Sequence, residues 1–347
     1  MGHLLPRSGR RRKLAWIAVA ALLPFSPAFA QEDFYRGKEI KWILSAGAGG
    51  GYSSYANAFA PFLSAHLPGK PNIVVQNMPG AGGLRAMQYL SAGAPKDGTT
   101  IGLVHSSVPF APLFDMAGAN FDPRKFGWIG SLNRANEICA SWHTSGIRTW
   151  QDMLDKQFIV GGTGGGSQME TMPEAFNKIF GTKIKIISGY NSGNEVYLAM
   201  ERGEVMGRCG VSYSSIMSTR PEWLPTGKVF APVILGLKRS KTFPGAPAII
   251  EFATDEATRQ TMEILLAYQD MDRPMIVPPG APPERLALLR KAFHEAMNDP
   301  GFIAEAARQR LEIDEVDGEF LAKSVNATFA QPRDRIEAAK AALASGK

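Results

Sequence analysis

The stretch "ILSAGAGGGYSSYANAF", residues 43–59, places four glycines directly after an apolar run. That run, residues 40–44, has the length and the β-branched and aromatic content of a buried strand. Aromatic residues follow at helical spacing from Tyr52 to Phe62, and Pro68 ends the helix. The glycines therefore occupy a strand-to-helix turn, where bare backbone N–H groups meet the positive end of a helix. Such a turn can bind an anion.

A second stretch repeats this pattern, "FIVGGTGGGSQMETMPEAF" at residues 158–176. Ser167 with Glu170, or Thr171 with Glu174, could form a capping box at the start of its helix. Two such turns suggest a ligand held between two lobes, because each helix end carries roughly half a positive charge. Together they could bind a carboxylate without Lys or Arg. Tight turns that need glycine only for positive φ explain the pattern equally well.

Strand-like runs alternate with helix-like stretches along the chain, which favours an α/β architecture with mostly parallel sheets. The strand-like runs are residues 39–44, 72–76, 100–104, 157–160, 184–187 and 229–235. The helix-like stretches are residues 52–66, 83–92, 168–180, 194–202, 256–267, 283–297, 302–310 and 317–329. Residues 332–347 are interpreted as a charged terminal helix or a frayed end. The length is comfortable for two domains.

The N-terminus has the pattern of a cleavable export signal. A basic segment ends at Lys13, an apolar run follows at residues 14–25, and Ala28-Phe29-Ala30 is a small-x-small cleavage site. The apolar run is shorter than the roughly 20 residues that span a bilayer. We expect residues 1–30 to be removed after Ala30 and the product to be exported. The basic segment leaves the Sec and twin-arginine routes both open.

Removal of that segment changes the charge of the protein. The chain has 38 Lys and Arg against 32 Asp and Glu, a net charge of +6. The expected signal holds five of the basic residues and none of the acidic ones, which leaves 33 against 32, or +1. A nucleic-acid-binding protein needs a clustered basic excess, so nucleic acid is not an expected partner.

Two nucleotide-binding motifs fail at particular positions. Gly47 and Gly49 supply the first two glycines of a dinucleotide fingerprint, but Tyr52 stands at the third. Gly161 and Gly166 have the spacing of a phosphate-binding P-loop, but Ser167-Gln168 replaces its Lys and Ser/Thr. We therefore expect no cofactor.

The remaining catalytic patterns are also weak. The five histidines do not have metal-ligand spacing, so no metal site is expected, and no G-x-S-x-G elbow is present. His105 beside Ser106 and Ser107 is the one neighbour set that could serve a hydrolase or lyase. The two cysteines, Cys139 and Cys209, could pair or remain buried thiols in an oxidising compartment. The sequence predicts a protein that is not an enzyme.

Several motifs, in order, resemble one known family. They are "FYRGKEIKWILSAGAGGGYSSYANAFAPFL", "VVQNMPGAGGLRAMQYLSAGAPKDGTTIGL", "VGGTGGGSQMETMPEAF", "ISGYNSGNEVYLAMERGEV", "FPGAPAII" and "VPPGAPPERLALLRKAFHEAMNDPGF". Spread over residues 34–330 after an export signal, they resemble the periplasmic substrate-binding subunits of tripartite tricarboxylate transporters, the Bug or TctC-type group. None is diagnostic alone.

The resemblance implies an α/β, two-lobed periplasmic-binding-protein fold of type II, a Venus flytrap with a central ligand cleft. One lobe would comprise residues 31–136 plus 233–347, and the other residues 137–232. It also implies a monomeric periplasmic receptor that captures a small organic di- or tricarboxylate and delivers it to integral membrane transporter subunits. A ligand-sensing receptor for a two-component kinase is the alternative of the same class.

The resemblance further implies that the two glycine loops pinch a carboxylate through backbone N–H groups. Carried over by position, the ligand-binding residues would be Ala48, Gly49, Gly50, Gly51, Tyr52, Ser53, Ser106, Ser107, Gly162, Thr163, Gly164, Gly165, Gly166, Ser167, Tyr190 and Arg208. The chain departs from the family where an Asp-Met-Met-Phe-Asp-like segment becomes Met206-Gly207-Arg208-Cys209-Gly210. The gained arginine could grip a second carboxylate, or pair with a neighbouring acid such as Glu204.

Overall fold

The computed structural model describes residues 1–3 and 34–343. The predicted signal segment and its cleavage point after Ala30 therefore lie outside the described residues, except for residues 1–3. Within the described ranges, no helix has both the length and the apolar character that crossing a bilayer requires.

The first of two sheets has six strands in the order β11-β4-β10-β3-β1-β2. Its strands are β1 (Glu39–Leu44), β2 (Asn72–Asn77), β3 (Thr100–Leu103), β4 (Gly127–Ser131), β10 (Pro274–Val277) and β11 (Val316–Asp317). Strand β1 pairs in parallel with β2 and β3, whereas β10 is antiparallel to β3 and β4, and β11 is antiparallel to β4.

The second sheet has five strands in the order β7-β6-β8-β5-β9. Its strands are β5 (Glu137–Trp142), β6 (Phe158–Gly161), β7 (Ile184–Ile187), β8 (Gly207–Ser212) and β9 (Val229–Leu235). Strand β6 is parallel to β7 and β8, and β5 is antiparallel to β8 and β9. The distribution of strands is the one that the predicted lobes need, and the lobe boundaries themselves stay a prediction.

Both sheets are mixed, so the expectation of mostly parallel sheets is wrong. Strands joined by a crossover helix lie parallel, as β1 and β2 or β6 and β7 do. Strands β5 and β9 instead carry the chain into and out of the second sheet, and β10 carries it back into the first. These entering strands are not part of helix-linked units, and they insert antiparallel to their neighbours.

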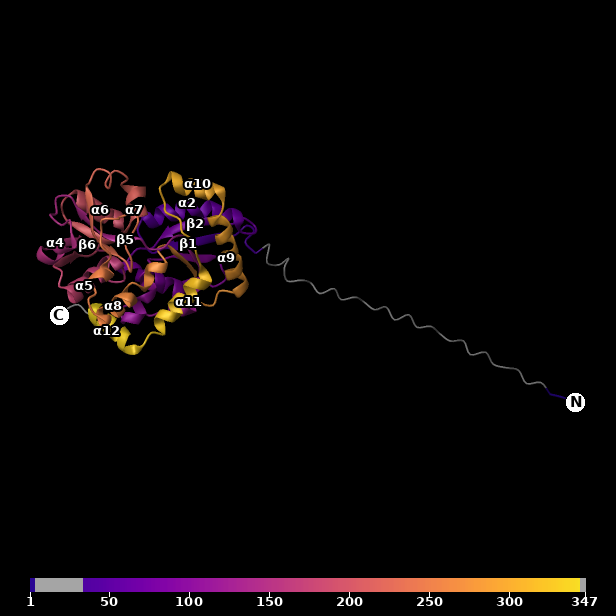
Figure 1. The fold of residues 1–347 in the computed structure, drawn as a ribbon. Helices are drawn as coiled ribbons and strands as arrows, with labels where there is room; N and C mark the ends of the chain where they lie inside the picture. Colours follow the sequence, from indigo (N-terminus) through magenta and orange to yellow (C-terminus); the bar gives the residue numbers. More distant parts are fainter. Residues whose placement is uncertain (4–33, 344–347) are drawn as a thin grey trace.

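Helices surround the two sheets (Figure 1). They are α2 (Gly51–His66), α3 (Leu84–Gln88), α4 (Trp150–Asp155), α5 (Gln168–Phe180), α6 (Gly193–Glu201), α7 (Tyr213–Thr219), α8 (Glu256–Leu265), α9 (Pro283–Met297), α10 (Pro300–Arg308), α11 (Gly318–Phe329) and α12 (Arg333–Leu343). Helices α2, α9 and α11 lie with the first sheet, and α4, α5 and α6 with the second. Helix α12 packs against α8 and α5, so the end of the chain returns to the second sheet.

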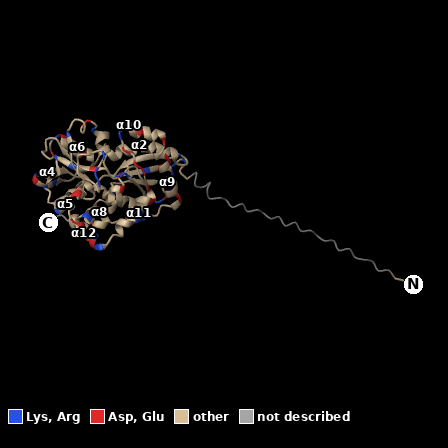
Figure 2. Cartoon of the chain, in the orientation of Figure 1, with Lys and Arg blue, Asp and Glu red and all other residues tan. Residues whose placement is uncertain are grey.

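The apolar core extends across both halves. One buried cluster joins Trp128 of the first sheet, Met172 and Phe176 of α5, and Ala339 and Ala342 of α12. Helix α12 is thus ordered by packing, which decides between the two interpretations of the tail in favour of a helix through Leu343. Basic and acidic residues are interspersed over the ribbon (Figure 2).

A disulfide joins Cys139 of β5 to Cys209 of β8, so the alternative of two free thiols is wrong. The two cysteines lie on hydrogen-bonded neighbouring strands and are fully buried. A bridge across a separation of 70 residues restricts the unfolded chain. For a loop of that size, the chain-entropy argument gives about 4 kcal/mol of stabilisation.

Candidate ligand-binding site

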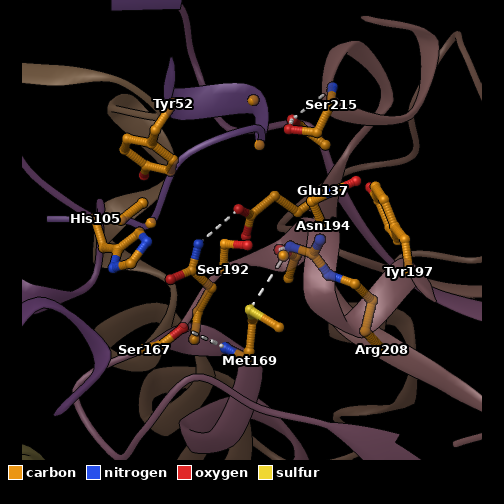
Figure 3. A pocket seen from close by; sticks show the side chains of 18 of the residues that line it. Tyr52, His105, Glu137, Ser167, Met169, Ser192, Asn194, Tyr197, Arg208 and Ser215 are labelled. Carbon is orange, nitrogen blue, oxygen red and sulfur yellow. Dashed lines mark hydrogen bonds between the residues drawn. The ribbon is translucent and has the colours of Figure 1, made fainter. Parts of the chain in front are cut away.

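A cleft lies between the two halves of the molecule, and residues from both sheets' halves line it (Figure 3). The first half contributes the turn after β1 and His105, and the second contributes the starts of α5 and α6 together with Arg208. The space between the walls, out to the open mouth, is about 520 Å³. Small-molecule sites typically enclose about 300–1,000 Å³.

Three helices begin at this cleft. Their first residues and caps line it: Gly50 and Gly51 of α2, Ser167 and Gln168 of α5, and Ser192 and Gly193 of α6. Ser167 and Ser192 each cap their helix with a side-chain oxygen, whereas no side chain of the described residues caps α2 at Gly50. Each N-terminus carries roughly half a positive charge, so all three favour an anion in the cleft.

Two glycines permit close approach across the cleft. A Cβ on Gly193 would collide with the Arg208 guanidinium, so the guanidinium lies directly against the start of α6. A Cβ on Gly47 would lie 2.9 Å from the carbonyl oxygen of Asn191. The Gly47 N–H donates to that same carbonyl at 3.0 Å, which joins the first half to the second.

Arg208 is a buried cation without an acidic partner. Its side chain emerges from β8 and is 7% exposed. Nη2 donates to the carbonyl of Gly210 at 3.2 Å and lies 3.6 Å from the sulfur of Met169, and the guanidinium lies 4.9 Å from the centroid of the Tyr197 ring. No other charged partner approaches it among the described residues, and its Nε donates to nothing there.

The alternative that Arg208 pairs with Glu204 is wrong. Glu204 instead lies 3.6 Å from Arg202, and both of those side chains are largely exposed. A buried guanidinium is costly unless an anion compensates it. The cleft therefore has an uncompensated positive charge where three helix N-termini also meet.

A second arginine at the cleft, Arg273, differs in having its charge compensated. It is 2% exposed and forms an ion pair with the neighbouring Asp272. Its Nη2 donates to Ser215 Oγ at 2.9 Å and to Ser212 Oγ at 3.3 Å, both beyond β8 in the second half. The guanidinium also stacks 4.2 Å from the centroid of Tyr52. Arg273 thus fastens the two halves together.

A carboxyl group also faces the cleft, that of Glu137 at the start of β5. Its Oε1 accepts from Nε2 of Gln168 at 2.8 Å, as the dashed line in Figure 3 marks. Burial, and then the nearby charge of Asp272, raise the pKa of Glu137 to about 7, against the opposing hydrogen bond from Gln168. Gly210 makes this contact possible, because it adopts a φ of +65° and a Cβ there would lie 2.6 Å from Cγ of Gln168.

His105 is held as a neutral ring. Burial lowers the pKa of His105 to about 4, and the charges of Arg273 and Arg208 act in the same direction, while the hydrogen bond to Gly82 opposes. Its Nδ1 lies 3.0 Å from the carbonyl oxygen of Gly82, and the ring meets Tyr52 edge-on at 4.7 Å. Because a carbonyl can only accept, Nδ1 has the proton and Nε2 is an acceptor.

The serines beside His105 serve α5. Ser107 Oγ lies 3.1 Å from the carbonyl of Gly166 and 3.0 Å from Oε1 of Gln168, and it accepts from the Gln168 N–H. Nε2 of Gln168 approaches Ser106 Oγ at 3.4 Å. In the described part of the chain, no hydrogen bond joins the His105 ring to either serine, so the nucleophile-and-base geometry of a hydrolase is not formed there.

The structure brings five of the residues predicted from the sequence to the cleft wall: Gly50, Gly51, Tyr52, Ser167 and Arg208. The others lie outside it: Ala48, Gly49, Ser53, Ser106, Ser107, Gly162, Thr163, Gly164, Gly165, Gly166 and Tyr190. Ligand contact stays a prediction for all of them.

The second glycine turn packs against another turn of the first half. The Gly82 N–H donates to the carbonyl of Thr163 at 2.9 Å, and a Cβ on Gly164 would lie 2.6 Å from the Gly82 nitrogen. Ser167 is the N-cap of α5, as expected. Glu170, however, accepts from the Gly164 N–H at 2.6 Å rather than from the cap, and Thr171 lies inside the helix. Both capping-box predictions are therefore wrong, and Glu170 shapes the glycine turn instead.

Several residues of the cleft were absent from the prediction. They include Glu137, Gln168, Ser192, Gly193, Asn194, Tyr197 and Arg273. The Ser192-x-x-Glu195 spacing is a helix-start signature that could have found the cap of α6. Glu137 and Arg273 have no local signal, because tertiary packing alone brings them to the cleft.

The fold and the cleft define a class of protein, a two-lobed α/β solute-binding receptor of the periplasmic type. The sequence pattern described as "Tripartite tricarboxylate transporter family receptor" matches residues 64–340. This chain belongs to that family, which consists of solute-binding receptors and is not an enzyme family.

Relatives agree with this assignment. The chain is 26% identical over 320 residues to the "UPF0065 protein in gbd 5'region" of Cupriavidus necator, covering 89% of each chain. Among solved structures, the periplasmic binding protein BugD superposes with a TM-score of 0.70 at 20% identity, over 89% of this chain and 98% of that one. MatC from Rhodopseudomonas palustris, solved with bound malate, gives a TM-score of 0.67 at 17% identity, over 86% and 99%.

Proposed function

We propose that the protein captures a small organic di- or tricarboxylate in this cleft and hands it, unaltered, to integral membrane transporter subunits. The observation that carries the proposal is Arg208, a buried guanidinium with no acidic partner among the described residues, at the meeting point of three helix N-termini. A ligand carboxylate would supply the missing anion.

Binding would proceed by closure of the two lobes, residues 31–136 plus 233–347 and residues 137–232. The glycine turn before α2 would present backbone N–H groups, and α5, α6 and Arg208 would close from the other side. Each charge-assisted hydrogen bond contributes about 1.5–3 kcal/mol. A few of them, less the cost of ordering, match micromolar affinity at about 8 kcal/mol.

Two further observations support a carboxylate. MatC, which shares the fold, was solved with malate, a dicarboxylate. The cleft of this chain also has an opposite-charge receptor for one carboxylate and three helix ends for a second. A receptor that feeds a sensor kinase would use the same cleft, and the transporter partner is favoured because the family is that of tripartite transporters.

The test is a thermal-shift screen of the chain purified after export from a bacterial host. The panel holds mono-, di- and tricarboxylates, amino acids, aromatic acids and neutral sugars. A carboxylate at 100 times its dissociation constant should add about 2.7 kcal/mol of stability, a shift of several degrees. R208M should lose most of that shift, whereas R202M, which alters an exposed arginine of the same half, should keep it.

Recovery of each stabilising ligand after incubation separates a receptor from a hydrolase or lyase. A ligand returned unchanged supports capture and delivery. Consumption of a hit, a response to neutral sugars alone, or an undiminished shift in R208M would overturn the proposal.

A further inference from the structure

The carboxyl of Glu137 is out of place in a cleft built for an anion. It is 2% exposed, lines the cleft, and lies on the same wall region as the ends of α5 and α6 in Figure 3. Arg208 and the three helix N-termini draw a negative ligand in, and a carboxylate nearby opposes that attraction. Its presence needs a compensating partner on the ligand.

The structure holds this carboxyl in place but leaves half of it unused. Oε1 accepts from Gln168 Nε2 at 2.8 Å, and Ser107, 3.0 Å from Oε1 of Gln168, fixes which end of that amide faces Glu137. Oε2 is buried, and within the described residues nothing donates to it. The hydroxyl of Tyr268 lies close enough to influence the Glu137 carboxyl but completes no hydrogen bond with it.

The other charged groups nearby do not satisfy Glu137. Arg273 is taken by Asp272, Ser212 and Ser215. Arg208 donates to Gly210 and makes no ion pair with Glu137 within 4.0 Å in the described part of the chain. The unused oxygen is therefore an unpaired acceptor at the cleft.

A second acceptor lines the same cleft. His105 is neutral and uses its Nδ1 proton for the Gly82 carbonyl, so its Nε2 can only accept. The cleft thus combines one unpaired cation, Arg208, with two acceptors, Glu137 and His105. A bare carboxylate satisfies the first and leaves the other two unmatched.

We infer that Glu137 accepts a hydrogen bond from a hydroxyl or ammonium group of the ligand, and that the receptor selects carboxylates bearing such a donor over bare carboxylates of the same skeleton. This inference rests on the proposed function and specifies its ligand class. Arg208 binds the carboxylate, and Glu137 with His105 recognises the donor.

The test uses ligands matched in skeleton and different in one group. The four-carbon set is succinate, malate and aspartate, and the three-carbon set is propionate, lactate and alanine. Titration calorimetry on the exported chain should show that a donor-bearing member of one set binds at least tenfold tighter than its bare counterpart. Malate and aspartate against succinate further separate a hydroxyl from an ammonium donor.

The variant E137Q keeps the shape of the side chain. Its amide oxygen can accept from Gln168, which turns the amide NH₂ toward the ligand and replaces the acceptor by a donor. E137Q should lose the tenfold preference while it binds the bare carboxylate as well as wild type or more tightly. E204Q, which neutralises an exposed acid of the same half, should behave as wild type.

The outcomes are distinct. If wild type binds the bare member as tightly as the others, or if E137Q retains the preference, the inference is overturned while the proposed function stands. If no carboxylate of either set or of the wider panel binds, the proposed function fails and the inference fails with it.

Discussion

Two buried arginines face the same cleft, yet their surroundings differ. Arg273 has Asp272 for its charge and two serine hydroxyls for its Nη2, whereas Arg208 has one carbonyl, one sulfur and an aromatic face. Both leave Nε without a partner among the described residues. The difference indicates that Arg273 stabilises the protein, while Arg208 is prepared for a ligand.

The variant R273M should have the largest effect. Removal of this guanidinium leaves Asp272 buried without its cation, and breaking a buried pair costs about 3–5 kcal/mol. We expect Tm to fall by roughly ten degrees in thermal unfolding. R134M, which removes an arginine of an exposed pair with Asp270, should cost less than about 1 kcal/mol. A loss in R273M no larger than in R134M would contradict a structural role for Arg273.

Glu137 belongs to the neighbourhood of the paired arginine, and E137Q sharpens the comparison through pH. Burial raises the pKa of Glu137 to about 7, so between about 4.5 and 7 the folded protein binds a proton that the unfolded chain releases. The stability of wild type relative to E137Q is therefore greatest below pH 4.5 and is lost as pH rises through 7. Chemical denaturation at pH 5 and pH 8 should show E137Q gaining about 2–3 kcal/mol on wild type. A pH-independent difference would contradict the raised pKa.

The fold was largely predictable because its elements have strong local patterns. The strand at residues 184–187 and the helices at residues 168–180 and 283–297 have the boundaries expected from apolar periodicity, proline and glycine. Strands β4, β8 and β10 were missed, since their glycines, Arg208 and short lengths obscure the apolar run. The direction of β5, β9 and β10 depends on how the chain passes between sheets, which no local pattern encodes.

The cleft was less predictable than the fold. The turn before α2 and the cap of α5 were found because glycine and serine before a helix have a physical meaning at that position. Glu137 and Gln168 lie 31 residues apart and become partners only because Gly210 lets α5 approach β8. The second glycine turn was expected at the ligand and packs on Gly82 instead, because positive-φ glycines serve tight backbone contacts as readily as ligand approach.

The variant R208M should reverse the pattern of R273M. Removal of an uncompensated charge costs little, since only the contact with Tyr197 and one hydrogen bond are lost, and the free protein should unfold within about 1 kcal/mol of wild type. Affinity for the carboxylate identified by the screen should fall about 10- to 100-fold, which calorimetry measures. Destabilisation of the free protein comparable to that of R273M would show that Arg208 has a structural role after all.

The smallest effect concerns the other contact that joins the halves, the backbone contact of Gly82. This glycine has a φ of +66°, and a Cβ on it would lie 2.5 Å from the carbonyl oxygen of Gly164, so G82A should push the two turns apart. Gly146 is a matched control, because its φ is +73° and a Cβ there would meet nothing within 4 Å. Both variants should lose about 1–2 kcal/mol of stability through backbone strain. Only G82A should also weaken carboxylate binding, by roughly tenfold or less, if the contact forms as the lobes close on the ligand. Equal affinities in G82A and G146A would mean that the turns stay in contact whether or not a ligand is bound, and that closure depends on Arg273 and Arg208 alone.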